Sequence, residues 1–136
     1  MKELTLPAKR ENIPLIIDFV NRELNSLGSS RKAKAQIDIA IDEVYSNIAK
    51  YGYGDKCGDV TVAIETDREN HAVSISFADE GRPFNPLEHA DPDITLSARD
   101  RKIGGLGIYM VKKSMNDVRY EYREGKNILT IRKSLT

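Results

Sequence analysis

The spacing of apolar residues changes along this chain, and the change restricts the folds that it can adopt. Over residues 12–27, and again over residues 31–48, apolar side chains recur every three or four positions, which is typical of amphipathic helices. Over residues 60–64 and 73–77 they alternate with polar side chains instead, which is typical of half-buried strands. Two helices followed by a hairpin predict an α+β domain, with helices covering one face of a sheet.

Local signals mark the ends of the two helices. Asn12 is a candidate cap for the first helix, and Gly28 ends it. Ser29 or Ser30 caps the second helix, which ends at Gly52. The two helices are therefore expected to be separate elements that are joined by a very short connection.

Three further elements complete the prediction. They are a short edge strand that ends at Pro7, a helix opened by Gly104-Gly105-Leu106-Gly107, and a final hairpin of residues 118–123 and 128–131. The expected order is β α α β β loop α β β. It predicts a single domain over residues 1–136, a two-layer sandwich whose mixed, mostly antiparallel sheet carries helices on one face.

Charge and composition exclude several functions. The 21 basic and 21 acidic residues cancel, so no global field attracts nucleic acid or an anionic membrane. A single cysteine, Cys57, permits no internal disulfide, and with two histidines the chain offers no soft-ligand set for zinc. No apolar stretch approaches the length of a membrane span. We therefore expect a cytoplasmic protein that binds neither membranes nor nucleic acid directly.

Glu43 and Asn47 are the first candidate functional pair. They lie four residues apart, and therefore on one face of the second helix, beside the apolar stripe that contains Ile41 and Val44. A carboxamide and a carboxylate offer the hard oxygens that Mg2+ prefers, and the carboxylate can also accept a proton. The alternative is an ordinary hydrated helix edge.

Two further candidate segments contain glycine. The Gly104–Gly107 segment places unhindered backbone at a helix N-terminus, which suits a phosphate chain, although it matches neither a P-loop nor a dinucleotide-binding motif. The alternative is a loop that needs glycine for a tight turn. Asp79 ends a strand two residues before Gly81, where it can accept a hydrogen bond from an adenine amino group. The alternative there is a plain Asx turn.

Taken in order, these segments resemble the N, G1 and G2 boxes of the GHKL ATPase superfamily. Gly52-Tyr53 after the N box, and Pro83-Phe84-Asn85-Pro86 after Asp79-x-Gly81, are most similar to bacterial anti-sigma factor serine/threonine protein kinases. The resemblance implies a Bergerat fold that binds ATP and Mg2+ beneath a lid, here residues 87–104. Tyr51 replaces the usual histidine, Asn85 the usual aspartate, and Lys126-Asn127 the usual Gly-Thr, which leaves the adenine pocket and the phosphate side near the last strand in question.

The resemblance also implies roles for individual residues. Glu43 would be the catalytic general base, Asn47 the Mg2+ ligand, and Asp79 the residue that recognises adenine. The implied nucleotide-binding residues are Asn47, Lys50, Asp79, Gly81, Arg101, Lys102, Gly104, Gly105, Leu106 and Gly107.

The implied function is that of an anti-sigma factor with protein serine/threonine kinase activity. It would phosphorylate a STAS-domain anti-sigma factor antagonist, regulate a sigma factor, and form a homodimer through the sheet edge or the first helix. Two alternatives remain at this point. One is an ATP-binding regulatory module without catalysis, and the other is the catalytic domain of a histidine kinase, although no helix with a phosphoacceptor histidine precedes the motifs.

Overall fold

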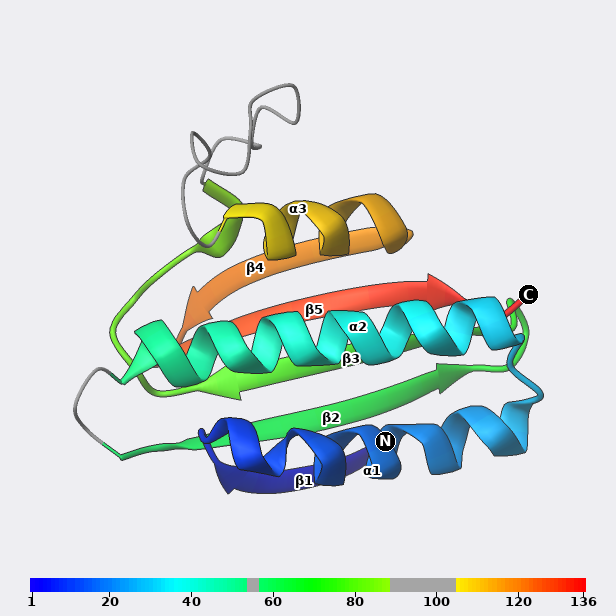
Figure 1. Cartoon of the computed structure of the whole chain (residues 1–136), viewed down its shortest axis with the longest axis horizontal. Helices are drawn as coiled ribbons and strands as arrows, with labels where there is room; N and C mark the ends of the chain where they lie inside the picture. The colour runs from blue at the N-terminus through cyan, green and yellow to red at the C-terminus, as the bar shows by residue number, and fades with distance from the viewer. Residues whose placement is uncertain (54–56, 89–104) are drawn as a thin grey trace.

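The computed structural model describes residues 1–53, 57–88 and 105–136. They form a five-stranded sheet in the order β1-β2-β3-β5-β4, with helices packed on one of its faces (Figure 1). The strands are β1 (Lys2–Pro7), β2 (Asp59–Asp67), β3 (Ala72–Asp79), β4 (Asp117–Arg123) and β5 (Lys126–Ser134). Every pairing between them is antiparallel, so the parallel component that a mixed sheet allows does not occur among these strands.

The helical layer follows the predicted order. It consists of α1 (Ile13–Leu27), α2 (Arg31–Asn47) and α3 (Gly105–Ser114), together with three short segments, η1 (Arg10–Asn12), η2 (Ile48–Gly52) and η3 (Pro86–Glu88). In Figure 1, α1 and α2 cross the sheet side by side, and α3 lies beside β4. The predicted α+β sandwich and the edge position of the first strand are both confirmed.

Two of the predicted helix boundaries have the expected chemistry. Gly28 adopts φ 69° after the last turn of α1, a left-handed conformation that favours glycine. The Ser30 hydroxyl accepts a hydrogen bond from the Ala33 amide at 3.1 Å and so caps α2. Asn12 occupies the N-cap position of α1 as predicted, but its side chain forms no capping hydrogen bond, and its Nδ2 donates to the Pro7 carbonyl at 2.9 Å.

The hydrophobic core lies between the helices and the sheet. Its most deeply buried side chains include Ile16, Val20, Leu24, Ile37, Ile41, Val44, Tyr45, Ile64, Ile75, Phe77 and Ile131. Tyr45 of α2 is fully buried, and its hydroxyl donates to the Pro7 carbonyl at 2.6 Å. Burial raises the pKa of Tyr45 to about 12, so the hydroxyl remains a donor at neutral pH. This bond ties the C-terminal half of α2 to the end of β1.

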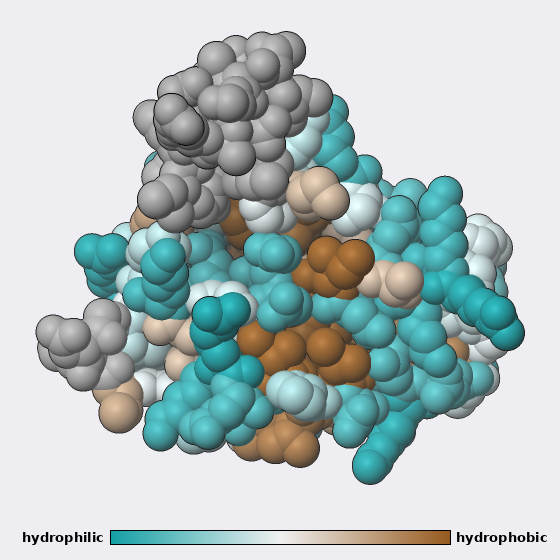
Figure 2. All heavy atoms as spheres, in the orientation of Figure 1, coloured by the Kyte–Doolittle hydropathy of each residue, from teal (hydrophilic) through white to brown (hydrophobic). Residues whose placement is uncertain are grey.

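The outer surface of the helical layer is mostly hydrophilic, with an apolar area over α1 and α2 (Figure 2). Leu15 of α1 and Ile39 of α2 are each 53% exposed. No helix in the three described ranges is long and apolar enough to cross a membrane.

Candidate functional site

The predicted pair on the second helix lies where the sequence placed it. Glu43 and Asn47 are half-buried at the edge of α2, beside the fully buried Ile41 and Val44. After Asn47 the helix widens into the π-helical segment η2, an irregularity that often occurs at functional sites. Packing of the apolar stripe therefore fixes both polar side chains at the rim of the core.

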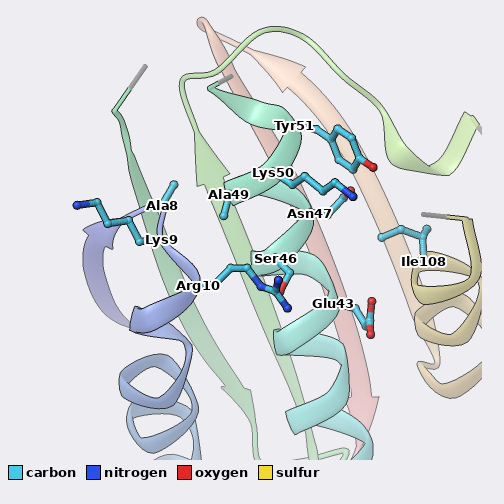
Figure 3. A pocket seen from close by; sticks show the side chains of 10 residues that line it. All are labelled: Ala8, Lys9, Arg10, Glu43, Ser46, Asn47, Ala49, Lys50, Tyr51 and Ile108. Atoms are coloured by element: carbon cyan, nitrogen blue, oxygen red, sulfur yellow. The ribbon is translucent and has the colours of Figure 1, made fainter. Parts of the chain in front are cut away.

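A wide cavity of about 620 Å3 opens over this helix edge (Figure 3). Its lining residues are Ala8, Lys9, Arg10, Glu43, Ser46, Asn47, Ala49, Lys50, Tyr51 and Ile108. In Figure 3, Arg10 extends from the connection between β1 and α1 toward α2, while Glu43 points toward the helix that carries Ile108. The cations of Lys9, Arg10 and Lys50 give the cavity the charge that suits phosphate.

Lys9 and Arg10 were not predicted as site residues. They follow the first strand directly, in a connection that contains no recognised motif. The only available signal was their position at a strand end next to a helix, and that signal alone is weak. Arg10 is exposed, and it forms no ion pair within the described ranges.

A second cavity, of about 30 Å3, lies on the other side of Asn47. It is lined by Val44, Asn47, Ile48, Phe77, Asp79, Phe84, Pro86, Tyr120, Asn127 and Leu129. Most of these side chains are apolar or aromatic, and Asp79 supplies the negative charge. Because Asn47 lines both cavities, an apolar compartment with one carboxylate adjoins a compartment rich in cations.

Asp79 is 5% exposed at the end of β3. Its Oδ1 accepts hydrogen bonds from the Gly81 amide at 2.9 Å and from Asn127 Nδ2 at 3.1 Å. Burial raises the pKa of Asp79, and these two bonds partly oppose the rise. Its Oδ2 accepts no hydrogen bond from the residues that the structure describes. Oδ1 thus forms the Asx turn with Gly81, and Oδ2 is the oxygen that is left as the candidate acceptor for a ligand.

Gly81 brings two parts of the chain into close contact. A Cβ at this position would lie 2.2 Å from the Gly52 carbonyl oxygen, a backbone atom that cannot move aside. The Arg82 amide donates to the same oxygen at 3.0 Å. Gly81 therefore allows the loop after β3 to pack closely against the end of η2.

Sequence reasoning did not name Asn127 among the predicted nucleotide-binding residues. The difference from the family pattern at Lys126-Asn127 left the adenine pocket and the phosphate side near the last strand in question, and the pairing of β3 with β5 sets Asn127 directly opposite Asp79. Its side chain is 5% exposed and lines the small cavity. The register of β3 and β5 would have shown this position, but the sequence does not determine which strands pair.

The other two residues that differ from the family pattern, Tyr51 and Asn85, make local contacts. Tyr51 lines the wide cavity, its ring centroid lies 6.2 Å from that of Phe84, and Lys50 Nζ lies 5.1 Å from its centroid. Asn85 Oδ1 accepts a hydrogen bond from the Leu87 amide at 2.9 Å. This bond stabilises the turn that leads into η3.

The third predicted segment opens α3, which begins at Gly105 as expected. Gly107, in its first turn, lies against Glu43: a Cβ there would be 1.9 Å from Glu43 Oε2. The glycine therefore makes room for the carboxylate beside the helix N-terminus. The predicted residues Arg101, Lys102 and Gly104, and nearly all of the predicted lid, lie outside the described residues, as does the Leu106 side chain.

The environment of Glu43 favours a carboxylate that can accept a proton. Burial and the neighbouring charge of Asp42 raise its pKa, while the Arg10 guanidinium opposes the rise. A raised pKa makes the Glu43 carboxylate a stronger base.

Asn47 lies between a cavity rich in cations and a cavity with a buried aspartate, beside a helix opened by glycine. Together with the α+β sandwich, this arrangement is typical of Bergerat-fold, ATP-binding domains. The histidine kinase-like ATPase domain matches residues 6–133, so the chain belongs to that family.

Relatives with curated names refine the comparison. The serine-protein kinase RsbW of Listeria monocytogenes is 29% identical over 131 residues, covering 93% of this chain and 82% of the relative. The RsbW of Bacillus mycoides is 26% identical, covering 93% and 81%.

Solved structures share the fold at low identity. The RsbU and RsbW domains of a Mycobacterium tuberculosis protein align with a TM-score of 0.67 at 18% identity, over 99% of this chain and 33% of that chain. The catalytic domain of histidine kinase ThkA aligns with a TM-score of 0.57 at 13% identity, over 100% and 99%.

Gly107→Ala tests the contact between α3 and Glu43. We expect the domain to stay folded, because the atom that meets the new methyl group is the end of a flexible side chain. The displaced Glu43 carboxylate gains solvent, so its pKa falls toward the ordinary value. Carboxyl-carbon NMR titration of Glu43 measures this change. An unchanged Glu43 titration would contradict the contact.

Proposed function

We propose that this protein is an ATP-dependent serine/threonine protein kinase. It phosphorylates a small STAS-domain anti-sigma factor antagonist, binds a sigma factor, and so regulates transcription. The observation that carries the proposal is the meeting of two cavities at Asn47, with Glu43 in one and Asp79 in the other. The names of its relatives support the kinase activity and the choice of serine or threonine as acceptor.

The small cavity is the proposed adenine site. Asp79 Oδ2 is available to accept a hydrogen bond from the 6-amino group, and Phe77, Phe84 and Leu129 offer apolar contacts to a ring. Its volume of about 30 Å3 is that of about one water molecule, so the cavity has to widen when a base enters. Phe84 lies in the loop after β3, outside the regular sheet.

The wide cavity is the proposed site of the triphosphate and of the accepting hydroxyl. Lys50 and Arg10 supply positive charge there, and Glu43 faces the first turn of α3. Glu43 takes the proton of the serine or threonine hydroxyl of the substrate, and the hydroxyl oxygen attacks the γ-phosphorus of ATP. The bond between the γ-phosphorus and the β–γ bridging oxygen then breaks, which releases ADP. Positioning and neutralisation of charge account for most of the catalysis in reactions of this kind.

Mg2+ fits this donor set. The described residues contain no cluster of three or more histidine, cysteine or acidic side chains that could hold a metal alone. Mg2+ is usually held by one or two protein oxygens with phosphate and water completing its shell. Asn47 Oδ1 would be the main protein ligand, and the ion would neutralise phosphate charge when it is bound.

The remaining parts of the proposal concern assembly and location. We propose a homodimer in the cytoplasm. The proposed dimer surfaces are the edge strand β1 and the apolar area around Leu15 of α1.

The central test is Glu43→Gln, with recombinant STAS-domain proteins of the source genome and labelled ATP. Because a general base contributes about 10²- to 10⁴-fold to a rate, we expect phosphate transfer to fall by at least about 100-fold. ATP affinity, measured by calorimetry, should change by less than about threefold, since the glutamine keeps the shape of the side chain.

Asp42→Asn is the matched control for Glu43→Gln. It removes an exposed carboxylate from the adjacent position of α2, which lowers the pKa of Glu43 but leaves the proposed base in place, so it should retain transfer. Full transfer by Glu43→Gln would reject the proposed base. Tight ATP binding by the wild type with no transfer to any antagonist would instead support the binding module.

Asn47→Ala tests the metal ligand. We expect wild-type ATP affinity to rise when Mg2+ is added, and the increase to be reduced at least about tenfold in the variant because one protein oxygen is lost from the shell. Calorimetry with ATP, in the presence of Mg2+ or of EDTA, measures the difference. Equal Mg2+ dependence in the two proteins would remove this role from Asn47.

Arg10→Ala tests the electrostatics of the base. Arg10 lowers the pKa of Glu43, so its removal raises that pKa, and a higher pH is then needed to keep Glu43 deprotonated. The acidic limb of the profile of kcat/KM against pH should move to higher pH in Arg10→Ala. Arg10→Lys keeps the charge and should move it less. A limb that is identical in all three proteins would show that Arg10 does not act on the base.

A further inference from the structure

The side chain of Asn127 has all of its polar atoms engaged. Nδ2 donates to Asp79 Oδ1 at 3.1 Å, to the Gly81 carbonyl at 3.3 Å and to the Arg82 carbonyl at 2.9 Å. Oδ1 accepts from the Phe84 amide at 3.1 Å and from the Tyr120 hydroxyl. A buried amide with this many partners has one stable orientation.

The first consequence concerns Asp79. Its Oδ1 already accepts two hydrogen bonds, from Gly81 and Asn127, so rotation of the carboxylate would break both. Its Oδ2 is the oxygen that remains for a ligand. The direction in which Asp79 accepts a hydrogen bond is therefore set before any nucleotide enters the cavity.

The second consequence concerns the other polar groups nearby. The Tyr120 hydroxyl is bonded to Asn127, and the Tyr53 hydroxyl is bonded to the Glu80 amide at 2.8 Å and the Asp59 carbonyl at 2.7 Å. Among the described residues that line the small cavity, Asp79 Oδ2 and the Asn47 amide are left to contact a base. The cavity thus presents a single fixed carboxylate oxygen on its β3 side.

We propose that Asn127 is a positioning residue that determines base specificity, by holding Asp79 as a fixed acceptor for the 6-amino group of adenine. The inference rests on the nucleotide site proposed above but not on kinase activity. Hypoxanthine, a 6-oxo purine, places its own acceptor oxygen against Asp79 Oδ2, and a buried pair of acceptors is unfavourable. If the Asp79 carboxylate could turn, it could instead accept a hydrogen bond from the N1–H of hypoxanthine.

Asn127→Thr and Asn127→Val form a matched pair for the test. Both lose the contacts with Arg82 and Phe84 and have nearly the same shape, but only threonine keeps a donor that can face Asp79. The dissociation constants of ADP and IDP are measured by calorimetry in EDTA, without metal and without phosphate transfer. The ratio of the two constants is informative because general destabilisation weakens both nucleotides alike.

We expect the wild type to prefer ADP over IDP by at least about 100-fold, since a site built to hydrogen-bond an amino group rejects its oxo analogue. The ratio should fall at least about tenfold in Asn127→Val and stay within about threefold of wild type in Asn127→Thr. Equal ratios in these two variants would overturn the inference, whether both keep the preference or both lose it.

If circular dichroism shows that neither Asn127→Thr nor Asn127→Val folds, Asn127→Ser and Asn127→Ala make the same comparison with smaller side chains. Equal ratios of the ADP and IDP dissociation constants in those two variants would again overturn the inference. A wild type that binds ADP and IDP equally would overturn it directly while leaving nucleotide binding intact. A wild type that binds neither would overturn the proposed nucleotide site, and the role of Asn127 with it.

Discussion

The packing of α2 against the sheet is the interaction on which the rest of this structure depends. Burial of one isoleucine or valine side chain contributes about 1.5–3 kcal/mol, and α2 buries Ile37, Ile41 and Val44 completely or nearly so. The Tyr45 hydrogen bond to β1 adds a directional constraint to this apolar contact. Because the apolar stripe cannot turn away from the core, its polar edge cannot turn either. Glu43 and Asn47 thus keep their positions although neither side chain forms a hydrogen bond with the residues that the structure describes.

Much of the fold could be predicted from the sequence because its signals are local. Helical spacing identified α1 and α2, alternation identified β2 and β3, and Gly28 and Ser30 marked boundaries by their own conformational chemistry. Asn12 showed the limit of such reasoning. Its Nδ2 donates to the carbonyl at the end of β1, and its Oδ1, the atom that could accept from the first turn of α1, forms no capping hydrogen bond.

The candidate site could be predicted where a motif lies within one element, as on α2. It could not be predicted where strand pairing brings distant residues together. Asn127 is 48 positions from Asp79, and only the antiparallel pairing of β3 with β5 sets them opposite each other. Likewise, Arg10 becomes a neighbour of Glu43 only after the β1–α1 connection folds over α2, and the sequence contains no periodic signal for that contact.

The antiparallel ladder between β3 and β5 also makes the proposed base site sensitive to the alignment of β5 with β3. Side chains alternate between the two faces of a strand, so shifting β5 by one residue would turn Asn127 away from the cavity and bring Ile128 to face it. The short turn at Glu124 and Gly125, both at positive φ, fixes the alignment of β5 with β4, on the side away from β3. An insertion or deletion in this turn that moved β5 along β3 would therefore alter the proposed base site from outside the cavity.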